Sequence, residues 1–192
     1  MYLYCKTTVG IYSTNRRTGM KNGIFIILAI VCFLACCDGK YKSAKSVAEL
    51  TISFIDSKWD GRKIPKSGQC TNCGGGGLSP PLLVKNIPKN TDVLIVKFRD
   101  KSMAIDHGAI RFQISEKTEF AIPSVPEQTF DLPPGAEMES KHYAPLGSPG
   151  AYMAPCGCGF NNRYVATIVA IKNETSGQKF LIGKGKIKLG RF

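Results

Sequence analysis

The cysteines of the later part of the chain have types and spacings that could do chemistry. Cys70 and Cys73 form a CxxC pair, and Cys156 and Cys158 form a CxC pair much further along. An even number of cysteines in an exported domain favours structural disulfides, which we expect first. Two pairs of thiolates also supply four ligands for tetrahedral zinc or another soft metal, the second alternative. A redox-active CxxC comes third, because the expected thioredoxin-like βαβ setting is missing.

Several other polar residues could bind a small ligand. His107, Asn162 and Tyr164 offer an imidazole, an amide and a phenol, which are groups that bind phosphate or carboxylate in a concave polar spot. Asp100 could hold His107 in one tautomer. The alternatives are a structural histidine at position 107 and a tyrosine packed in the core at position 164.

The sequence gives little support for catalysis. His142 is the only other histidine, and it lies in a loop rich in proline and glycine. Ser79 has neither the context of a nucleophile elbow nor an evident base close in sequence. We therefore expect a binding protein rather than an enzyme.

Residues 1–36 are predicted to form a leader, with Met20 as the expected start. Lys21 precedes an apolar run, GIFIILAIVCFLA, that is too short to span a bilayer and suits a signal-peptide core. The run ends in Ala35-Cys36, which resembles the lipobox of bacterial lipoproteins, where the cysteine is acylated. An ordinary secretory signal and an uncleaved anchor are the alternatives. The sequence thus predicts a protein of the cell envelope, attached to the membrane through Cys36 and facing the periplasm or the cell exterior.

The rest of the chain reads as a polar tether, residues 37–48, followed by a domain over residues 49–192. Alternation over residues 50–54 predicts a half-buried strand, and apolar runs predict strands over 93–98, 107–114 and 164–172. The closing KFLIGKGKIKLGRF predicts two short strands. Sustained helical periodicity is missing from the sequence, so we expect a mainly β domain with few short helices.

The charge of the chain bears on its partners. The formal net charge is +12, which raises the question of nucleic acid. The basic residues are spread out, however, and Lys184, Lys186 and Lys188 alternate with small or apolar residues, which puts them on one face of a strand. We interpret them as protection of a sheet edge, with attraction to anionic lipid as a second reading, and we expect no nucleic-acid partner.

A series of short motifs runs in a fixed order between Leu50 and Ile171: LTISF, DGRKIP, GLSPPL, NIPKNT, LIVKFRD, DHGAI, LPPG, YMAPCGCG and NRY. The series resembles the phosphatidylethanolamine-binding protein family, in particular its bacterial, Raf kinase inhibitor-like branch. LSPPL, Leu78 to Leu82, is the most specific piece. The resemblance implies a β-sandwich with a small pocket for anionic groups at one end, lined by loops from separate strands.

The resemblance also assigns pocket residues. Asp100 takes the position of the family's first aspartate, His107 that of the histidine at a strand start, Ala154-Pro155 that of a Gly-Pro step, and Asn162 and Tyr164 fall on a His-Arg-Tyr segment. The chain departs from the family where Lys101 and Ser102 replace Pro and Asp, where Gly108 replaces Trp, and where Asn162 replaces His. Loss of one imidazole favours a neutral or monoanionic ligand over a dianionic phosphate.

In the family's architecture, the loop before LSPPL and the loop after Ala154 lie near one end of the sandwich. The four later cysteines are therefore expected to converge there, with two bridges joining Cys70 and Cys73 to Cys156 and Cys158. The expected function is an envelope-anchored protein that binds a small anionic or polar ligand or modulates an envelope protein partner. The alternative is a metal-binding or thiol-redox protein that uses the four cysteines.

Overall fold

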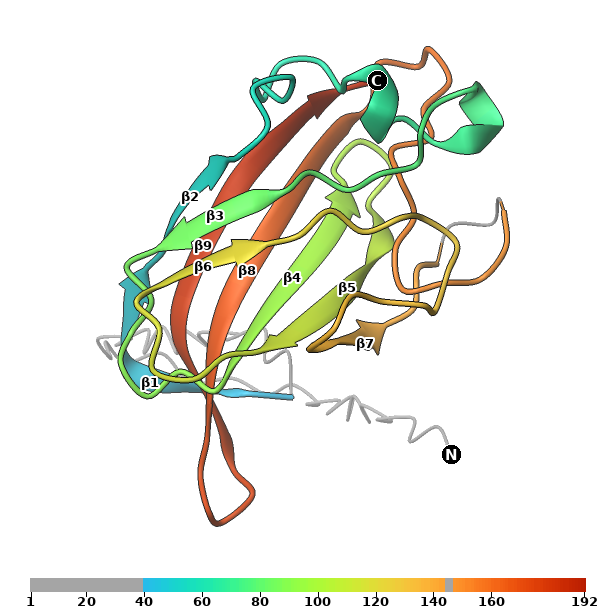
Figure 1. The fold of residues 1–192 in the computed structure, drawn as a ribbon. Coiled ribbons are helices and arrows are strands. Elements are labelled where there is room, and N and C mark those ends of the chain that lie inside the picture. The colour runs from blue at the N-terminus through green and yellow to red at the C-terminus, as the bar shows by residue number, and fades with distance from the viewer. Residues whose placement is uncertain (1–39, 144–146) are drawn as a thin grey trace, which may run out of the picture. The chain divides into compact units, whose positions relative to one another are not determined.

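The computed structural model describes residues 40–143 and 147–192, and residues 37–192 form one compact unit. Its larger sheet has six strands in the order β1-β9-β8-β4-β5-β7 (Figure 1). The pairs β9-β8, β8-β4, β4-β5 and β5-β7 are antiparallel, and β1 is parallel to β9. The strands are β1 (Lys42–Glu49), β4 (Val93–Asp100), β5 (Ile105–Gln113), β7 (Ala136–Ser140), β8 (Arg163–Asn173) and β9 (Lys179–Arg191).

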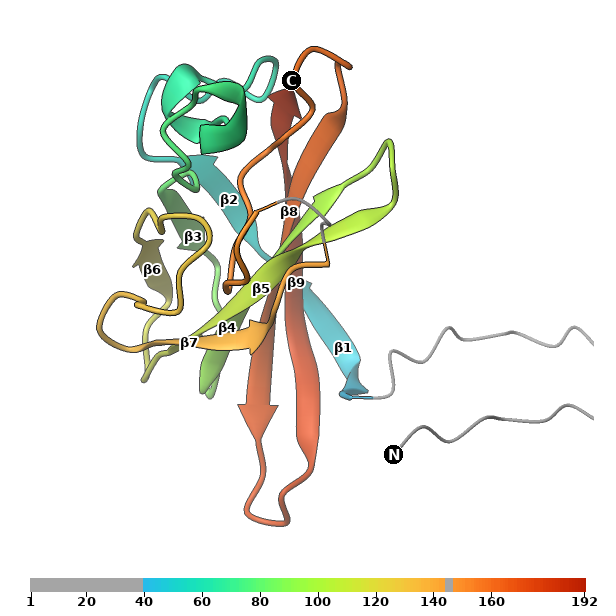
Figure 2. The ribbon, with the colours of Figure 1, turned by 90° about the vertical axis from the view of Figure 1, so that its right-hand side faces the viewer.

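A smaller antiparallel sheet packs against the larger one. It has the order β2-β3-β6, with strands β2 (Thr51–Phe54), β3 (Leu82–Lys85) and β6 (Glu119–Ile122). Figure 2 shows the two sheets as separate layers of a sandwich. The helical structure within the described residues consists of two short 3-10 turns, η1 (Lys66–Gly68) and η2 (Thr71–Cys73). The predicted mainly β sandwich is confirmed.

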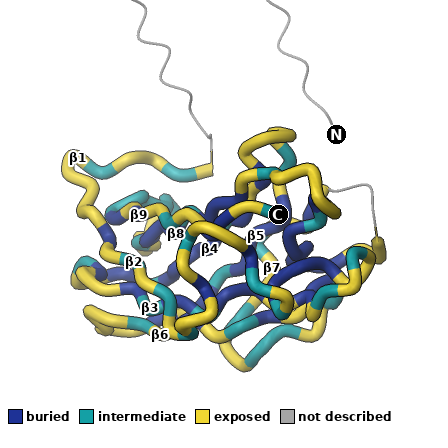
Figure 3. The backbone as a smooth tube through the Cα atoms, turned by 90° about the horizontal axis from the view of Figure 1, so that it is seen from above, coloured by how far each residue is buried: buried dark blue, intermediate teal, exposed yellow. Residues whose placement is uncertain are grey.

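Strand β4 shows why the middle of the sandwich is so apolar. Leu94, Val96 and Phe98 belong to the main core between the sheets, whereas Val93 and Ile95 belong to a second cluster with Tyr41 and Leu181 beside it. Successive side chains of a strand point to opposite faces, so a strand buried on both faces needs a continuous apolar run. Figure 3 shows these inner strands as the buried part of the domain.

The N-terminal part of the domain differs from the prediction. Residues 42–48, which the sequence assigns to the tether, form most of β1 (Lys42–Glu49), so the regular structure begins before residue 49. Nearly every residue of β1 is exposed, and its backbone pairs with β9 (Figure 3). A strand held by backbone hydrogen bonds alone leaves no hydrophobic alternation to detect in the sequence. The leader, Met20 and Cys36 lie outside the described residues.

The C-terminal strand also differs from the prediction. This segment forms one long strand, β9 (Lys179–Arg191), rather than two short pieces. Gly183 and Gly185 do not interrupt it; they lie within the strand at points where a Cβ atom would press on neighbouring groups. Lys184, Lys186 and Lys188 are all exposed, as expected. The reading of a protected sheet edge is wrong at Lys184, because β1 pairs with β9 up to that residue.

Loops gather at one end of the sandwich, which is the upper end in Figure 1. They include η1, η2 and the segment that leads into β8. Glycines in left-handed conformations turn the chain here, for example Gly74 after η2 at φ 72° and Gly159 at φ 100°. Over residues 40–143 and 147–192 we find no helix of sufficient length and apolarity to cross a membrane.

Candidate functional site

A buried carboxylate organises one corner of the loop end. Asp100 ends β4 and is paired in register with Tyr164 of β8. One of its oxygens, Oδ1, accepts hydrogen bonds from the backbone N–H groups of Ser102 at 2.7 Å and Met103 at 3.1 Å, and Oδ2 accepts from Asn162 Nδ2 at 2.8 Å. Asp100 is almost fully buried, so these three donors replace its lost hydration. The carboxylate thus fixes the turn between β4 and β5. We call Asp100, Asn162 and this turn, residues 101–104, the polar corner.

His107, on β5, faces this corner and is held by a backbone carbonyl. Its Nδ1–H donates to the Met153 carbonyl at 2.9 Å, and the Met153 N–H donates to the His107 carbonyl at 3.0 Å. A ring nitrogen that donates to a carbonyl carries the proton, so Nε2 is the bare nitrogen of the neutral ring. The predicted role of Asp100 in fixing the tautomer of His107 is therefore wrong. The Met153 carbonyl fixes it, and the carboxylate oxygens of Asp100 accept from the turn and from Asn162. Burial, the main cause, lowers the pKa of His107 below 6.5.

Tyr164 stands edge-on to His107, with 5.4 Å between the ring centroids. Its side chain is buried, and burial together with the charge of Asp100 raises the pKa of its phenol to about 12. The phenol is therefore neutral over the physiological range and can donate a hydrogen bond. His107 and Tyr164 thus present a neutral imidazole and a neutral phenol beside the polar corner.

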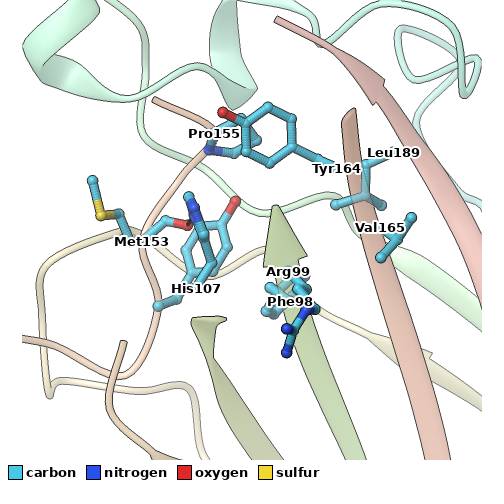
Figure 4. Close-up of a pocket in the computed structure, with 9 residues that line it drawn as sticks. Phe98, Arg99, His107, Met153, Pro155, Tyr164, Val165 and Leu189 are labelled. Carbon is cyan, nitrogen blue, oxygen red and sulfur yellow. Dashed lines mark hydrogen bonds between the residues drawn. The ribbon is translucent and has the colours of Figure 1, made fainter. Parts of the chain in front are cut away.

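A small hollow separates these rings from the neighbouring strands and loops, as Figure 4 shows. The space between the lining atoms, counted together with the open solvent at its mouth, is about 160 Å³, and the hollow itself has no room for a water molecule. The lining residues are Phe98, Arg99, His107, Tyr152, Met153, Pro155, Tyr164, Val165 and Leu189.

The predicted ligand-binding residues divide into two groups. His107, Pro155 and Tyr164 line the hollow, and Asp100, Ala154 and Asn162 do not. Asn162 is turned toward Asp100, and Ala154 is fully buried with its N–H on the Glu127 carboxylate at 3.1 Å. The second group therefore supports the wall instead of facing the hollow.

Tyr152 is a lining residue that the sequence analysis did not identify. Its side chain is buried, and among the described residues its hydroxyl has no hydrogen-bond partner. Leaving a buried hydroxyl unpaired costs roughly 1–3 kcal/mol. The sequence did carry a signal for this role. Tyr152 lies two residues before the Ala154-Pro155 step, and a buried aromatic side chain next to a predicted pocket loop has to face either the core or the pocket.

Gly108 lets the loop carrying Tyr152 approach His107. The residue has φ +94°, and a Cβ atom there would lie 2.1 Å from the Ala151 carbonyl oxygen. Any side chain at this position would push the 151–153 backbone away from β5. Glycine at position 108 is thus required for the close approach of the 151–153 backbone to β5.

The four later cysteines lie next to the hollow, behind Pro155. Cys70 is bonded to Cys156 and Cys73 to Cys158, which confirms the predicted cross-loop disulfides. We call η2, its flanking Cys70 and the 155–158 segment the stapled wall. The backbone N–H of Cys70 also donates to the Pro155 carbonyl at 2.9 Å, so the staples adjoin a residue that lines the hollow.

Glu127 ties the stapled wall together a second time. Its Oε1 accepts from the Thr71 backbone N–H and hydroxyl, both at 2.7 Å, and its Oε2 accepts from Ala154. Gly77 packs against this carboxylate, where a Cβ atom would lie 3.0 Å from Oε1. Glu127 sits in a proline-rich segment without periodicity, so the sequence carries no signal for its role.

Comparison with known proteins gives the fold. No family model matches the sequence, and no curated protein matches it. The solved structure of E. coli YbcL, described as a new member of the mammalian phosphatidylethanolamine-binding protein family, superposes with a TM-score of 0.53 at 16% identity, over 76% of this chain and 98% of YbcL. A putative phosphatidylethanolamine-binding protein homologue from Chlamydia trachomatis, CT736, gives 0.48 at 18% identity, over 77% and 98%. The chain therefore has a fold like that of the phosphatidylethanolamine-binding proteins, as its motifs suggested.

Proposed function

We propose that the protein is a binding protein of the phosphatidylethanolamine-binding type, and that the hollow beside His107 and Tyr164 receives a small polar group. The observation that carries the proposal is the buried, unpaired hydroxyl of Tyr152 within the lining. A ligand group that bonds this hydroxyl would remove its desolvation cost. The shared fold with YbcL supports a binding role, because that protein is described as a family member.

The charges around the hollow favour a neutral or monoanionic ligand. His107 is neutral with a bare Nε2, and Asp100 places a negative charge behind Tyr164. Arg99 is the cation in the lining, and its guanidinium pairs with Asp106 at 2.6 Å. A dianionic phosphate would need cationic donors that this lining does not concentrate. A hydroxyl or an amide can donate to the imidazole and accept from a phenol, and a protonated amine can donate to the imidazole.

Binding requires the hollow to widen, because its free space is narrower than a water molecule. Met153 and Pro155 both line the hollow (Figure 4), and they belong to the loop that leads to the disulfide-bonded Cys156 and Cys158. Met153 is unbranched and changes rotamer easily. We therefore assign the opening movement to the 152–155 segment, with the strands of the larger sheet as the fixed side.

Amide chemical shifts of the labelled protein, titrated with phosphoethanolamine, inorganic phosphate and acetate in parallel, test this function. Saturable shifts at Tyr152, His107 and Tyr164 are expected, larger for acetate, a monoanion, than for inorganic phosphate above pH 7, where phosphate is largely dianionic. Tyr152→Phe should weaken binding, and Tyr143→Phe, at an exposed tyrosine, serves as the matched control. Shifts that avoid the hollow with all three probes would contradict the proposal.

We also propose that the protein is exported and anchored in the cell envelope through a lipid on Cys36, where it binds its ligand or acts on an envelope partner. The support is the signal-like run that ends in Ala35-Cys36. Cys36→Ala should release the protein from the membrane fraction, with Cys37→Ala as the control. Unchanged fractionation of Cys36→Ala would contradict the anchor.

The cysteine cluster favours zinc binding as a second candidate function. The four sulfur atoms all lie within 4.8 Å of one another, a spacing that suits tetrahedral coordination once the disulfides are reduced. Protein reduced and refolded with zinc should then hold one equivalent after dialysis, and Cys70→Ser should lose it. Retention of zinc by Cys70→Ser would place the metal elsewhere.

A further inference from the structure

The two disulfides of the stapled wall lie against each other, and one sulfur touches all the rest. Cys73 is bonded to Cys158, and its sulfur lies 3.3 Å from Cys70 Sγ and 3.8 Å from Cys156 Sγ. Both distances are within ordinary contact range, about 4 Å. Cys73 is therefore in contact with both sulfurs of the neighbouring disulfide. It lies beside the Cys70–Cys156 bond, so once released from Cys158 its side chain has to turn into line with that bond before it can attack.

Access to the cluster is graded. Cys158 is exposed, Cys73 and Cys156 are half-buried, and Cys70 is fully buried. Cys158 also has φ 42°, a left-handed conformation that non-glycine residues rarely adopt. Thiol–disulfide exchange depends on which sulfur a thiolate can reach. A reductant from solution therefore meets the Cys73–Cys158 bond first, at Cys158.

We propose that the four cysteines form a two-electron thiol–disulfide exchange centre with Cys73 as its pivot, and that a dithiol reductant converts the two cross-loop disulfides into a single Cys70–Cys73 disulfide. This activity depends on the cysteines alone and not on ligand binding in the hollow.

The exchange proceeds in three displacements. A thiolate of the reductant attacks Cys158 Sγ, forms a mixed disulfide, and releases Cys73 as a thiolate. Cys73 attacks the adjacent Cys70 Sγ, so the Cys70–Cys73 bond forms, the Cys70–Cys156 bond breaks, and Cys156 leaves as a thiolate. The second thiolate of the reductant then closes its own disulfide and releases Cys158. The dithiol loses two electrons, one protein disulfide is reduced, and its two protons end on Cys156 and Cys158.

The product differs from simple reduction of the outer bond in one important way. Simple reduction leaves Cys70 bonded to Cys156, so the two loops remain joined. Exchange through Cys73 removes both covalent links with the same two electrons. Glu127 continues to bond Thr71 and Ala154, which keeps the sulfurs close enough for the reverse reaction. The centre therefore opens and closes the stapled wall in one redox step.

Site-resolved alkylation of the full chain tests the proposal. The protein is treated with one equivalent of dithiothreitol in the presence of EDTA, quenched with acid, alkylated, and read cysteine by cysteine by tandem mass spectrometry, apart from Cys5, Cys32, Cys36 and Cys37. We expect label on Cys156 and Cys158 and a disulfide-linked Cys70–Cys73 peptide. Label on Cys73 and Cys158, with Cys70–Cys156 intact, would overturn the proposal.

A pair of variants tests the pivot without any reductant. Cys158→Ser leaves Cys73 as a free thiol beside an intact Cys70–Cys156 bond, so the label should be shared among Cys70, Cys73 and Cys156. Cys73→Ser leaves Cys158 free instead, and its label should stay on Cys158. Both variants keep one staple, and circular dichroism checks their fold. Label confined to Cys73 in Cys158→Ser, or an equal scatter in Cys73→Ser, would overturn the assignment of Cys73.

Discussion

The stapled wall and the polar corner support the same hollow by different chemistry. The stapled wall joins segments 85 and 86 residues apart with two covalent bonds and the Glu127 carboxylate. The polar corner joins β4 to the start of β8 through hydrogen bonds: Asp100 accepts from Asn162, Ser102 Oγ accepts from the Arg163 N–H at 3.1 Å, and the Lys101 N–H donates to the Arg163 carbonyl at 2.7 Å. The first wall therefore has covalent supports, and the second is held by hydrogen bonds. Conditions that reduce disulfides therefore act on the stapled wall and leave the hydrogen bonds of the polar corner in place.

Removal of all four cysteines of the stapled wall should have the largest effect. Replacement by serine opens a loop of about the length for which loop-closure entropy predicts roughly 4–5 kcal/mol. Each single pair, Cys70/Cys156 or Cys73/Cys158, should cost about half as much, because the remaining pair keeps the long loop closed. Urea unfolding of the three variants measures this. If loss of a single pair lowered the free energy of unfolding as much as loss of all four cysteines, the two disulfides would not be independent supports of the same loop.

Asp100→Asn should have the next largest effect, about 3 kcal/mol, because a buried acceptor of three hydrogen bonds becomes an amide that has to turn a donor toward other donors. The matched control is Asp106→Asn, an exposed partner of Arg99, for which the expected cost is below about 1 kcal/mol. Equal losses in the two variants would show that the polar corner is not held by Asp100. Urea midpoints at constant slope give both values.

His107 should make stability depend on pH. Its folded-state pKa is lowered by burial, so the unfolded chain binds the proton more readily and stability is complete above the unfolded value near 6.5. As pH falls from 6.5 toward the folded pKa, this contribution is progressively lost. The difference in unfolding free energy between pH 7.5 and 5.5 should shrink in His107→Gln. A His107 ring that titrates above 6.5 by NMR would reverse the sign and contradict the assignment.

Tyr152→Phe should have the smallest effect and the opposite sign. It removes a buried hydroxyl without a described partner, so the free protein should gain up to about 1 kcal/mol while ligand binding weakens. Thermal unfolding with and without phosphoethanolamine separates the two effects. A destabilised Tyr152→Phe would mean that the hydroxyl already has a partner in the free protein.

The sequence predicted those parts of the fold that depend on buried apolar side chains. β4, β5 and β8 were identified because they are buried and rich in β-branched residues, and β2 because it alternates. β1 was missed because its side chains are exposed. The short β6 and β7 lie in a proline-punctuated segment for which little regular structure was expected.

The candidate site was predictable where one residue type implied one kind of bond. The even number of cysteines favoured disulfides over a metal or redox site, and the family resemblance implied that the bridges join the two loops. Asp100 and His107 were predicted to interact as a pair. A carboxylate accepts from any nearby donor, however, and in the structure the backbone N–H groups of Ser102 and Met103 donate to Asp100 instead of the His107 ring. Glu127 and the unpaired hydroxyl of Tyr152 depend on loop conformation, which local sequence does not encode.

Gly108 also constrains how this site can change by mutation. The Ala151 carbonyl fills the space a side chain at position 108 would need, and the positive φ adds a second penalty. A larger residue there requires the 151–153 loop to withdraw, and withdrawal of the loop breaks the Met153 hydrogen bond that holds His107. A single substitution at position 108 therefore disturbs the orientation of the His107 ring as well as the loop.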